Sequence, residues 1–184
     1  MPTRLADAVL IVINAQGEYL DGTLPLDGIG QALERLALLI TRTRRAGAAV
    51  IHIQHYKTPG RLFDPAAPSG GILARVAPLP GDLLIGKSSP NAFKGTDLGA
   101  QLAMLDRPPL ILAGFTTHLD VSATARAALD QGYAVMVAAD ATATRSLPDP
   151  LGGPEVSAAA VQAAALAALA DHVASITTVD SIPD

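Results

Sequence analysis

Six short hydrophobic runs recur along the chain, and most of them are apolar at consecutive rather than alternate positions. A continuous apolar run of this length is typical of a strand that is buried on both faces of a parallel sheet. The runs fall at residues 8–13, 49–54, 82–85, 110–113, 134–138 and 174–179. We therefore predict six buried strands.

Helical patterns lie between most of these runs. Residues 28–46 place leucines at helical spacing, collect arginines in the last turn and stop at Gly47, as the helix dipole and C-cap preferences favour. Further helices are predicted over residues 96–105, 119–131 and 156–171. The alternation of strands and helices predicts an α/β fold, with one domain over residues 1–184, a largely parallel sheet and right-handed crossovers.

One segment breaks the alternation. Residues 56–81 carry five prolines and four glycines and show no helical period. A loop of this length inside a compact domain is usually a lid, a binding loop or an oligomer contact.

Composition narrows the classes of function. The 184 residues carry a net charge of −4 and include no cysteine, which excludes disulfides, thiolate metal sites, iron–sulfur clusters and a cysteine nucleophile. The 13 Lys and Arg residues form no basic cluster, so we expect no nucleic-acid partner. No apolar stretch has the length of a membrane span, and the first residues lack the pattern of a signal peptide. We expect a cytoplasmic protein that acts on a small molecule.

Polar residues follow the predicted strands. Ligands of such sheets bind at the carboxyl ends of the strands, where the strand order reverses. Asn14 and Gln16 follow the first run, Lys87 follows the third, and residues 114–120 lead from the fourth run into a helix that begins near Asp120. We expect a lysine, an asparagine and an aspartate to converge there.

Three of these segments resemble, in order and spacing, the landmarks of the isochorismatase-like hydrolases, also called the cysteine hydrolase superfamily. They are AVLIVINAQ at residues 8–16, IGKSSPNAFKGTDL at 85–98, and residues 110–145. The resemblance covers most of the chain. It implies a single-domain, Rossmann-like three-layer sandwich around a six-stranded parallel sheet of order 3-2-1-4-5-6, and a homodimer or homotetramer.

The resemblance also implies a site, and this chain departs from it. Most of the family use an aspartate after the first strand, a lysine after the third and a cysteine at the start of the helix after the fourth. The matching positions hold Asn14, Lys87 and Asp120. A minority branch that acts on isochorismate also lacks the cysteine but keeps the first aspartate as the acid. Asn14 cannot accept a proton and Asp120 is a poor acyl nucleophile, so we reject the ordinary amidase route.

Three roles for Asp120 are open. It is a general base that activates water, a general acid, or a nucleophile that attacks an sp³ carbon. In the first two roles Lys87 acts electrostatically and Asn14 orients water or substrate. We favour base or acid, because the ester route needs a second, water-activating base, and His118 is the only nearby histidine.

The segment after the fourth strand matches the part of the family that carries a non-proline cis peptide, here Phe115–Thr116. In the family this turn directs backbone N–H groups, here those of Thr116 and Asp120, at a substrate oxyanion, and the start of a helix independently favours an anion. The residues that we expect to bind substrate are Thr116, Thr117, His118, Phe93, Gln16 and Tyr19, with Phe63 as a further pocket-lining aromatic.

We predict neither a metal nor a cofactor. Some family amidases hold a metal near the end of the second strand with an Asp-x-His pair. The segment from His52 to His55 lacks that pattern, and the chain has only four histidines. Few ligands are therefore left for a metal site.

Each key residue also has an ordinary structural interpretation. Asn14 fits a strand-end turn, Lys87 a surface position, and Asp120 the first turn of a helix. Asp140 is predicted to cap a turn, and Arg145 to be structural or inter-subunit. Our leading hypothesis is a hydrolase of a small polar or cyclic metabolite that uses Asp120 and Lys87. The alternative is a catalytically silent family member that binds a small ligand or serves as an oligomeric scaffold, which Asn14 favours.

Overall fold

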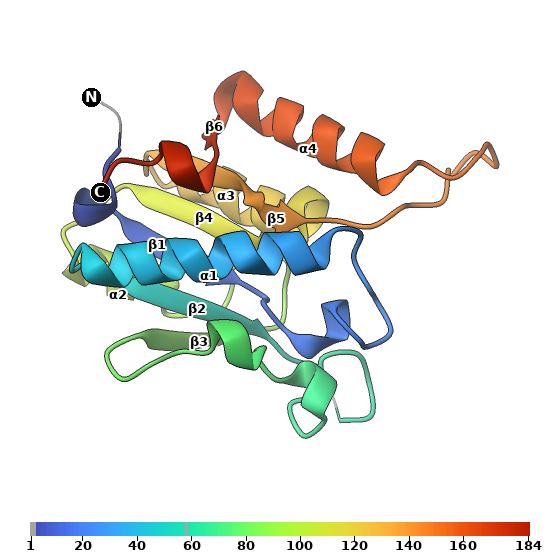
Figure 1. Cartoon of the computed structure of the whole chain (residues 1–184), viewed down its shortest axis with the longest axis horizontal. Coiled ribbons are helices and arrows are strands. Elements are labelled where there is room, and N and C mark those ends of the chain that lie inside the picture. Colours follow the sequence, from blue (N-terminus) through green and yellow to red (C-terminus); the bar gives the residue numbers. More distant parts are fainter. Residues whose placement is uncertain (1–2, 58) are drawn as a thin grey trace.

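The computed structural model describes residues 3–57 and 59–184 as one parallel sheet covered by helices on both faces (Figure 1). The strand order is β3-β2-β1-β4-β5-β6, and every neighbouring pair is parallel. The strands are β1 (Val9–Ile13), β2 (Val50–His55), β3 (Leu83–Lys87), β4 (Leu110–Phe115), β5 (Val135–Ala143) and β6 (Ser175–Thr177). The predicted three-layer fold and its strand order are confirmed. The prediction of six buried strands is wrong for β3 and β6, because these edge strands are mostly exposed or half-buried.

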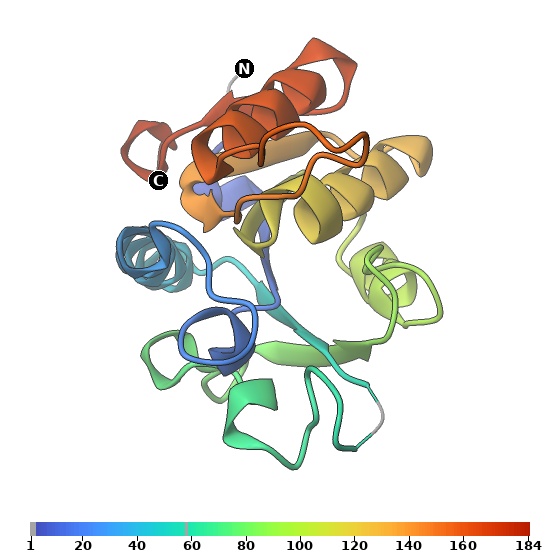
Figure 2. The same ribbon diagram turned by 90° about the vertical axis from the view of Figure 1, so that its right-hand side faces the viewer.

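The helices divide between the two faces of the sheet, as the view along the strands shows (Figure 2). They are α1 (Ile29–Arg45), α2 (Leu98–Met104), α3 (Ser122–Asp130) and α4 (Ala158–His172). Leu10 and Val12 of β1 belong to the hydrophobic cluster under α1, whereas Ile11 and Ile13 belong to the cluster under α2, α3 and α4. Because both faces of β1 are covered, both sets of alternate residues must be apolar, which explains the unbroken hydrophobic run.

The helix ends follow the signals in the sequence. Gly28, at the N-cap of α1, has a φ of 69°, in the left-handed region that glycine adopts without penalty. Three arginines occupy the last turn of the same helix. The side chain of Ser157 accepts a hydrogen bond from the N–H of Ala160 and so caps α4. The predicted helices therefore differ from the observed ones by only a few residues at each end.

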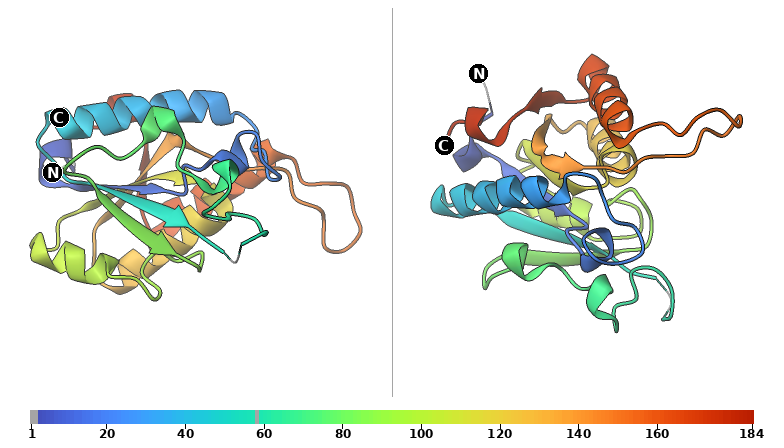
Figure 3. Two further views of the ribbon diagram at one scale, coloured as in Figure 1. Left: turned by 90° about the horizontal axis from the view of Figure 1, so that it is seen from below. Right: turned by 45° about the vertical axis from the view of Figure 1, so that its right-hand side comes forward.

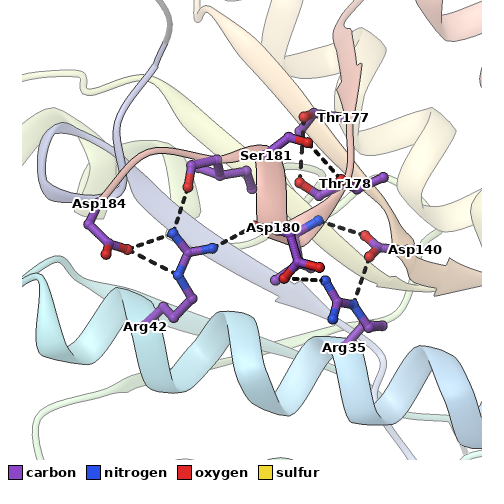
Figure 4. A network of polar contacts seen from close by, with 10 residues as sticks. Arg35, Arg42, Asp140, Thr177, Thr178, Asp180, Ser181 and Asp184 are labelled. Carbon is purple, nitrogen blue, oxygen red and sulfur yellow. Dashed lines mark hydrogen bonds and ion pairs between the residues drawn. The ribbon is translucent and has the colours of Figure 1, made fainter.

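Three strands, β3, β4 and β5, are longer than their apolar runs predict. β3 extends to Lys87 because Lys87 pairs with His55, the last residue of β2, in the parallel ladder. β5 continues to Ala143, and Asp140 caps a helical turn from within this strand, the turn that begins at Val179. Asp140 lies within β5, where its carboxylate accepts hydrogen bonds from Arg35 and from the N–H of Val179 (Figure 4).

Two irregular segments lie at the carboxyl ends of the strands. The predicted loop 56–81 contains two short helical turns, Pro68–Gly70 and Ala74–Val76. The second segment, residues 146–157, forms an arm that projects from the body between β5 and α4 (Figures 1 and 3). Backbone pairing between Leu147 and Val156 closes the arm at its base, and Leu151 at its tip is 93% exposed.

No helix in the part of the chain that the structure describes is both long enough and apolar enough to cross a membrane.

Candidate active site

The candidate site lies where four strand ends meet. β1 leads to Asn14, β2 ends at His55, β3 ends at Lys87, and β4 runs into a short π-helical turn, Thr117–Val121, that contains Asp120. β1 lies between β2 and β4, at the point where the strand order reverses. Residues distant in the sequence are therefore brought to one edge of the sheet, as this topology requires.

Gly114 allows β4 to approach β1 closely at this edge. Its φ is 106°, and a Cβ atom built on it would lie 2.1 Å from the carbonyl oxygen of Ile13. Only glycine combines that backbone conformation with that distance. The turn that carries Asp120 is thus fixed directly beside the end of β1.

Lys87 and Asp120 form a buried ion pair. Lys87 Nζ lies 2.6 Å from Asp120 Oδ1, and the two residues are only 1% and 3% exposed. The ammonium also donates to the carbonyl oxygen of Ser89 at 2.9 Å and contacts His55 Nδ1 at 3.1 Å. An ammonium has three N–H donors, so three acceptors saturate it. Burial lowers the pKa of Lys87, and the charge and hydrogen bond of Asp120 oppose that shift.

His55 is held in one tautomer by Lys87. A lysine ammonium donates but cannot accept, so Nδ1 of His55 must be the acceptor and Nε2 must carry the proton. Burial lowers the pKa of His55 to about 4, and the positive charge of Lys87 acts in the same direction. The imidazole is therefore neutral near pH 7. Its Nε2 is buried and finds no hydrogen-bond partner within the described residues.

Asn14 is the second unsatisfied polar group. It is fully buried and has a φ of 47°, a left-handed conformation that asparagine adopts more readily than most residues. Neither the oxygen nor the nitrogen of its amide makes a hydrogen bond to residues 3–57 or 59–184. Buried polar atoms without partners cost free energy, so an amide in this state indicates a place for a water molecule or a ligand.

Aromatic rings connect these polar groups. The ring of Phe63, from loop 56–81, lies 4.9 Å from that of His55 and 5.2 Å from that of Tyr19, measured between centroids. Burial raises the pKa of the Tyr19 phenol, and the charge of Asp120 raises it further. We call these six residues the central cluster: Asn14, Tyr19, His55, Phe63, Lys87 and Asp120.

The turn after β4 contributes the remaining predicted residues. The cis peptide expected at Phe115–Thr116 is present. Thr116 Oγ1 lies 3.5 Å from Asp120 Oδ2, whereas the hydroxyl of Thr117 donates to the carbonyl of Ala143. His118 Nδ1 is hydrogen-bonded to Thr144 Oγ1, and burial, together with the charge of Arg145, lowers the pKa of His118.

Two predicted substrate-binding residues have other contacts. Gln16 donates to the carbonyls of His55 and Gly70 and accepts from the N–H of His55, so its amide links the end of β2 to loop 56–81. Phe93 stacks on Tyr133, with 6.1 Å between the ring centroids. Tyr133 lies just before β5, away from the carboxyl ends of the strands. Neither contact brings the side chain to the Lys87–Asp120 pair.

Neither of the two described clefts is lined by a residue of the central cluster. A cleft of about 670 Å³ between α1, β5 and α4 is lined by neither Lys87 nor Asp120. A second, of about 750 Å³, is lined by Tyr56, Lys57, Pro59, Arg61, Leu62 and Ser88. Because Tyr56, Leu62 and Ser88 are the chain neighbours of His55, Phe63 and Lys87, this second cleft adjoins the central cluster.

Sequence reasoning missed the place of His55. The sequence pattern raises His55 only as a possible metal ligand, and no group of three or more potential metal ligands occurs among the residues described. The signal that identifies it is the parallel register, which pairs His55 with Lys87. That register depends on how far β2 and β3 continue beyond their apolar runs.

Comparisons with known proteins identify the family of the chain. Residues 8–181 match the isochorismatase domain. A solved isochorismatase from Pseudomonas putida KT2440 is 39% identical, superposes with a TM-score of 0.95, and the match covers 99% of this chain and 93% of that one. The chain belongs to the isochorismatase family, whose members are hydrolases.

Two further relatives are less similar in sequence. The secreted isochorismatase effector Isc1 of Verticillium dahliae is 32% identical, over 90% of this chain and 84% of its own length. A streptothricin hydrolase of Streptomyces noursei is also 32% identical, over 95% of this chain but only 63% of its own length. The names of these relatives refer to different substrates. Because one of the relatives is secreted, they also do not establish the compartment of this chain.

Proposed function

We propose that the protein hydrolyses a small polar or cyclic metabolite with a site that contains no thiol, in which Asp120 is the general base and Lys87 its electrostatic partner. The observation that carries the proposal is the 2.6 Å contact between Lys87 Nζ and Asp120 Oδ1, both buried at the carboxyl edge of the sheet. A buried ion pair adds little net stability over apolar side chains of similar volume. A chemical role explains its presence better than a structural one.

The geometry favours a base over an acid. Asp120 Oδ1 accepts a hydrogen bond from an ammonium, which leaves Oδ2, near the hydroxyl of Thr116, as the oxygen that can take a proton. In the proposed step Oδ2 takes a proton from water while the water oxygen bonds to the electrophilic carbon of the substrate. The same proton then passes to the leaving group as its bond to that carbon breaks.

Other groups in the site stabilise the developing negative charge and orient the attacking water. Backbone N–H groups at the start of a helix have no partners within it, and in the proposal those of Thr116 and Asp120 stabilise the developing oxyanion. The unpartnered amide of Asn14 orients the attacking water. Because Lys87 balances the charge of Asp120, the carboxylate does not by itself exclude an anionic substrate.

A substrate screen tests the proposal. Streptothricin and isochorismate, taken from the names of the relatives, would be offered with a panel of small cyclic amides, esters and vinyl ethers. The wild type would be compared with Asp120→Asn and Lys87→Ala. Loss of a general base typically lowers rates by 10²- to 10⁴-fold, and we expect at least a 100-fold loss of kcat for Asp120→Asn.

Matched controls come from exposed positions nearby. Asp130→Asn changes the last residue of α3, and Lys94→Ala changes a lysine in the same segment as Lys87. Both are expected to retain wild-type turnover. Equal turnover by wild type, Asp120→Asn and Lys87→Ala on every accepted substrate would end the catalytic proposal. Binding without turnover by any of them would favour the silent, ligand-binding alternative.

We also propose that the chain works as a homodimer or homotetramer, in which the arm 146–157 packs against a second copy. The arm projects from the body (Figure 3) and continues directly into α4, whose outward positions are mostly exposed alanines. Light scattering after gel filtration would measure the mass of the wild type and of Leu151→Asp. The proposal predicts a wild-type oligomer that Leu151→Asp weakens, and a wild-type monomer would refute it.

A further inference from the structure

The central cluster contains a hydrogen-bond donor that the proposed mechanism does not use. His55 Nδ1 faces Lys87 Nζ at 3.1 Å, and its ring packs on Phe63. Its Nε2 is buried without a partner in the described chain. A buried donor in this state loses its hydrogen bonds to water and gains none from the protein.

We propose that His55 is a substrate-binding residue, which presents Nε2–H to an oxygen acceptor of the substrate, such as a carbonyl, ring ether or hydroxyl oxygen. The inference rests on the proposed function, because it places the substrate within the central cluster. It adds a contact, and a requirement for an acceptor oxygen, that the Asp120–Lys87 chemistry alone does not demand.

Lys87 makes this role specific. Its ammonium occupies Nδ1, so the imidazole can offer only a donor at Nε2. A free histidine exchanges between two tautomers, whereas this one is confined to a single hydrogen-bonding pattern. Lys87 therefore has two effects in the cluster, since it balances the charge of Asp120 and sets the polarity of His55.

The unpartnered atoms in the cluster indicate what a ligand must provide. His55 offers one donor, and the amide of Asn14 offers an acceptor and donors. Both residues end or follow neighbouring strands, and the N–H of Asn14 is bonded to the carbonyl of Ile53 on β2. An acceptor oxygen of the substrate would accept the hydrogen bond from His55 Nε2–H. A donor or acceptor group next to that oxygen would form a hydrogen bond with the amide of Asn14.

Nitrogen-15 NMR of the histidine rings tests the first step without any substrate. We expect the His55 ring to show the neutral Nε2–H tautomer from pH 5.5 to pH 8, and Lys87→Met to release it into a mixture of tautomers. Acetamide and acetate, as small neutral and anionic acceptors, are expected to shift the Nε2–H proton resonance downfield. An Nδ1–H tautomer in the wild type, or no shift with either probe, would overturn the proposal.

Variants test the second step on a substrate from the screen. His55→Gln can accept from Lys87 and donate to substrate, whereas His55→Leu can do neither. We expect His55→Leu to lower kcat/KM by about 10- to 100-fold, the range for one lost donor, and His55→Gln to recover most of it. His172→Gln, at an exposed histidine on the last turn of α4, is the control.

The outcomes separate the two proposals. Equal loss of kcat/KM in His55→Gln and His55→Leu, with equal loss of melting temperature, would assign His55 a packing role and overturn the inference. If no compound is turned over but the probes shift the Nε2–H resonance of His55, the catalytic proposal fails and the binding role of His55 stands.

Discussion

Two regions of the molecule hold charged side chains in opposite ways. In the central cluster the Lys87–Asp120 pair is buried, and polar atoms of Asn14 and His55 have no partners among the described residues. Near the end of the chain, Arg35 and Arg42 of α1 hold residues 179–184 through side-chain and backbone contacts (Figure 4). We call this second region the arginine clamp.

The comparison separates stability from function. In the arginine clamp, Arg35 contacts both Asp140 and Asp180 at 2.8 Å, and Arg42 donates to the carbonyls of Val179 and Ile182. The acceptors around these guanidinium groups come from the chain itself. In the central cluster the chain leaves donors and acceptors open, a state tolerated where a ligand completes the set. Open atoms also occur at His52, Tyr133 and Gln162, so the functional region is marked by the open atoms of Asn14 and His55 together with the buried ion pair.

The largest expected effect comes from breaking the buried pair on one side. Lys87→Met leaves Asp120 without its counter-charge, and removing one partner of a buried ion pair costs about 3–5 kcal/mol. Urea denaturation would measure the loss in free energy of unfolding, with Lys94→Met as the exposed control. The double variant Lys87→Met/Asp120→Leu should recover a large part of it. A loss below about 1 kcal/mol would mean that the pair is not desolvated.

The next effect depends on pH and arises from His55. Its pKa is about 4 in the folded protein because of burial and the charge of Lys87, with Lys57 adding to the shift and Asp120 opposing it. The unfolded chain binds this proton near pH 6.5, so folding stability falls as the pH drops from about 6.5 towards 4.

His55→Gln removes that proton-binding site. We expect the variant to lose less stability than the wild type on acidification, by on the order of 2 kcal/mol between pH 7 and pH 5. Parallel urea titrations at the two pH values would measure the difference. His52 and His118, whose pKa values burial also lowers, are present in both proteins and cancel. Identical acid sensitivity would contradict the buried, neutral state of His55.

Arg35→Met probes the arginine clamp. The change removes donors to Asp140 and Asp180 from a side chain that is 28% exposed, and we expect a loss of about 1–2 kcal/mol in the free energy of unfolding. Arg126→Met, at an exposed position on α3, is the control. Turnover measured at 25 °C should not change, and a large loss of kcat would show that the two regions are coupled.

The smallest effect is expected at the exposed side of the clamp. Asp180 is 73% exposed in its pair with Arg35, so Asp180→Asn should cost roughly 0.5 kcal/mol or less, and nothing in 1 M NaCl. Thermal unfolding at low and high salt would measure this, with Asp130→Asn as control. The effect of Lys87→Met should instead persist in high salt, because solvent ions do not reach the buried pair.

Most of the fold could be predicted because the strands carry apolar runs, α1 carries leucines at helical spacing, and Ser157 caps α4. The strand ends could not, because Gln54, His55, Gly86 and Lys87 continue the ladder between β2 and β3 without being apolar. Backbone hydrogen bonds, rather than hydrophobicity, extend these strands. For the same reason, the apolar run 134–138 did not predict that β5 continues through Asp140.

The candidate site was predicted in part. Motif order placed Asn14, Lys87 and Asp120 at one edge, and the structure brings Lys87 and Asp120 into contact. Motif membership did not reveal side-chain direction: Phe93 belongs to the lysine motif but stacks on Tyr133, and Gln16 bonds to backbone. The catalytic roles stay predictions, which the variants above test.

The three acceptors around Lys87 Nζ also determine how readily this lysine reacts with acylating reagents. An amine attacks an activated ester only when it is deprotonated and has a free lone pair, whereas this nitrogen donates to Asp120, Ser89 and His55 and is shielded from solvent. Amine-directed acylation of the folded protein should therefore modify the exposed Lys94 and spare Lys87. Peptide mass spectrometry would then report Lys87 as the lysine that becomes reactive when the central cluster opens.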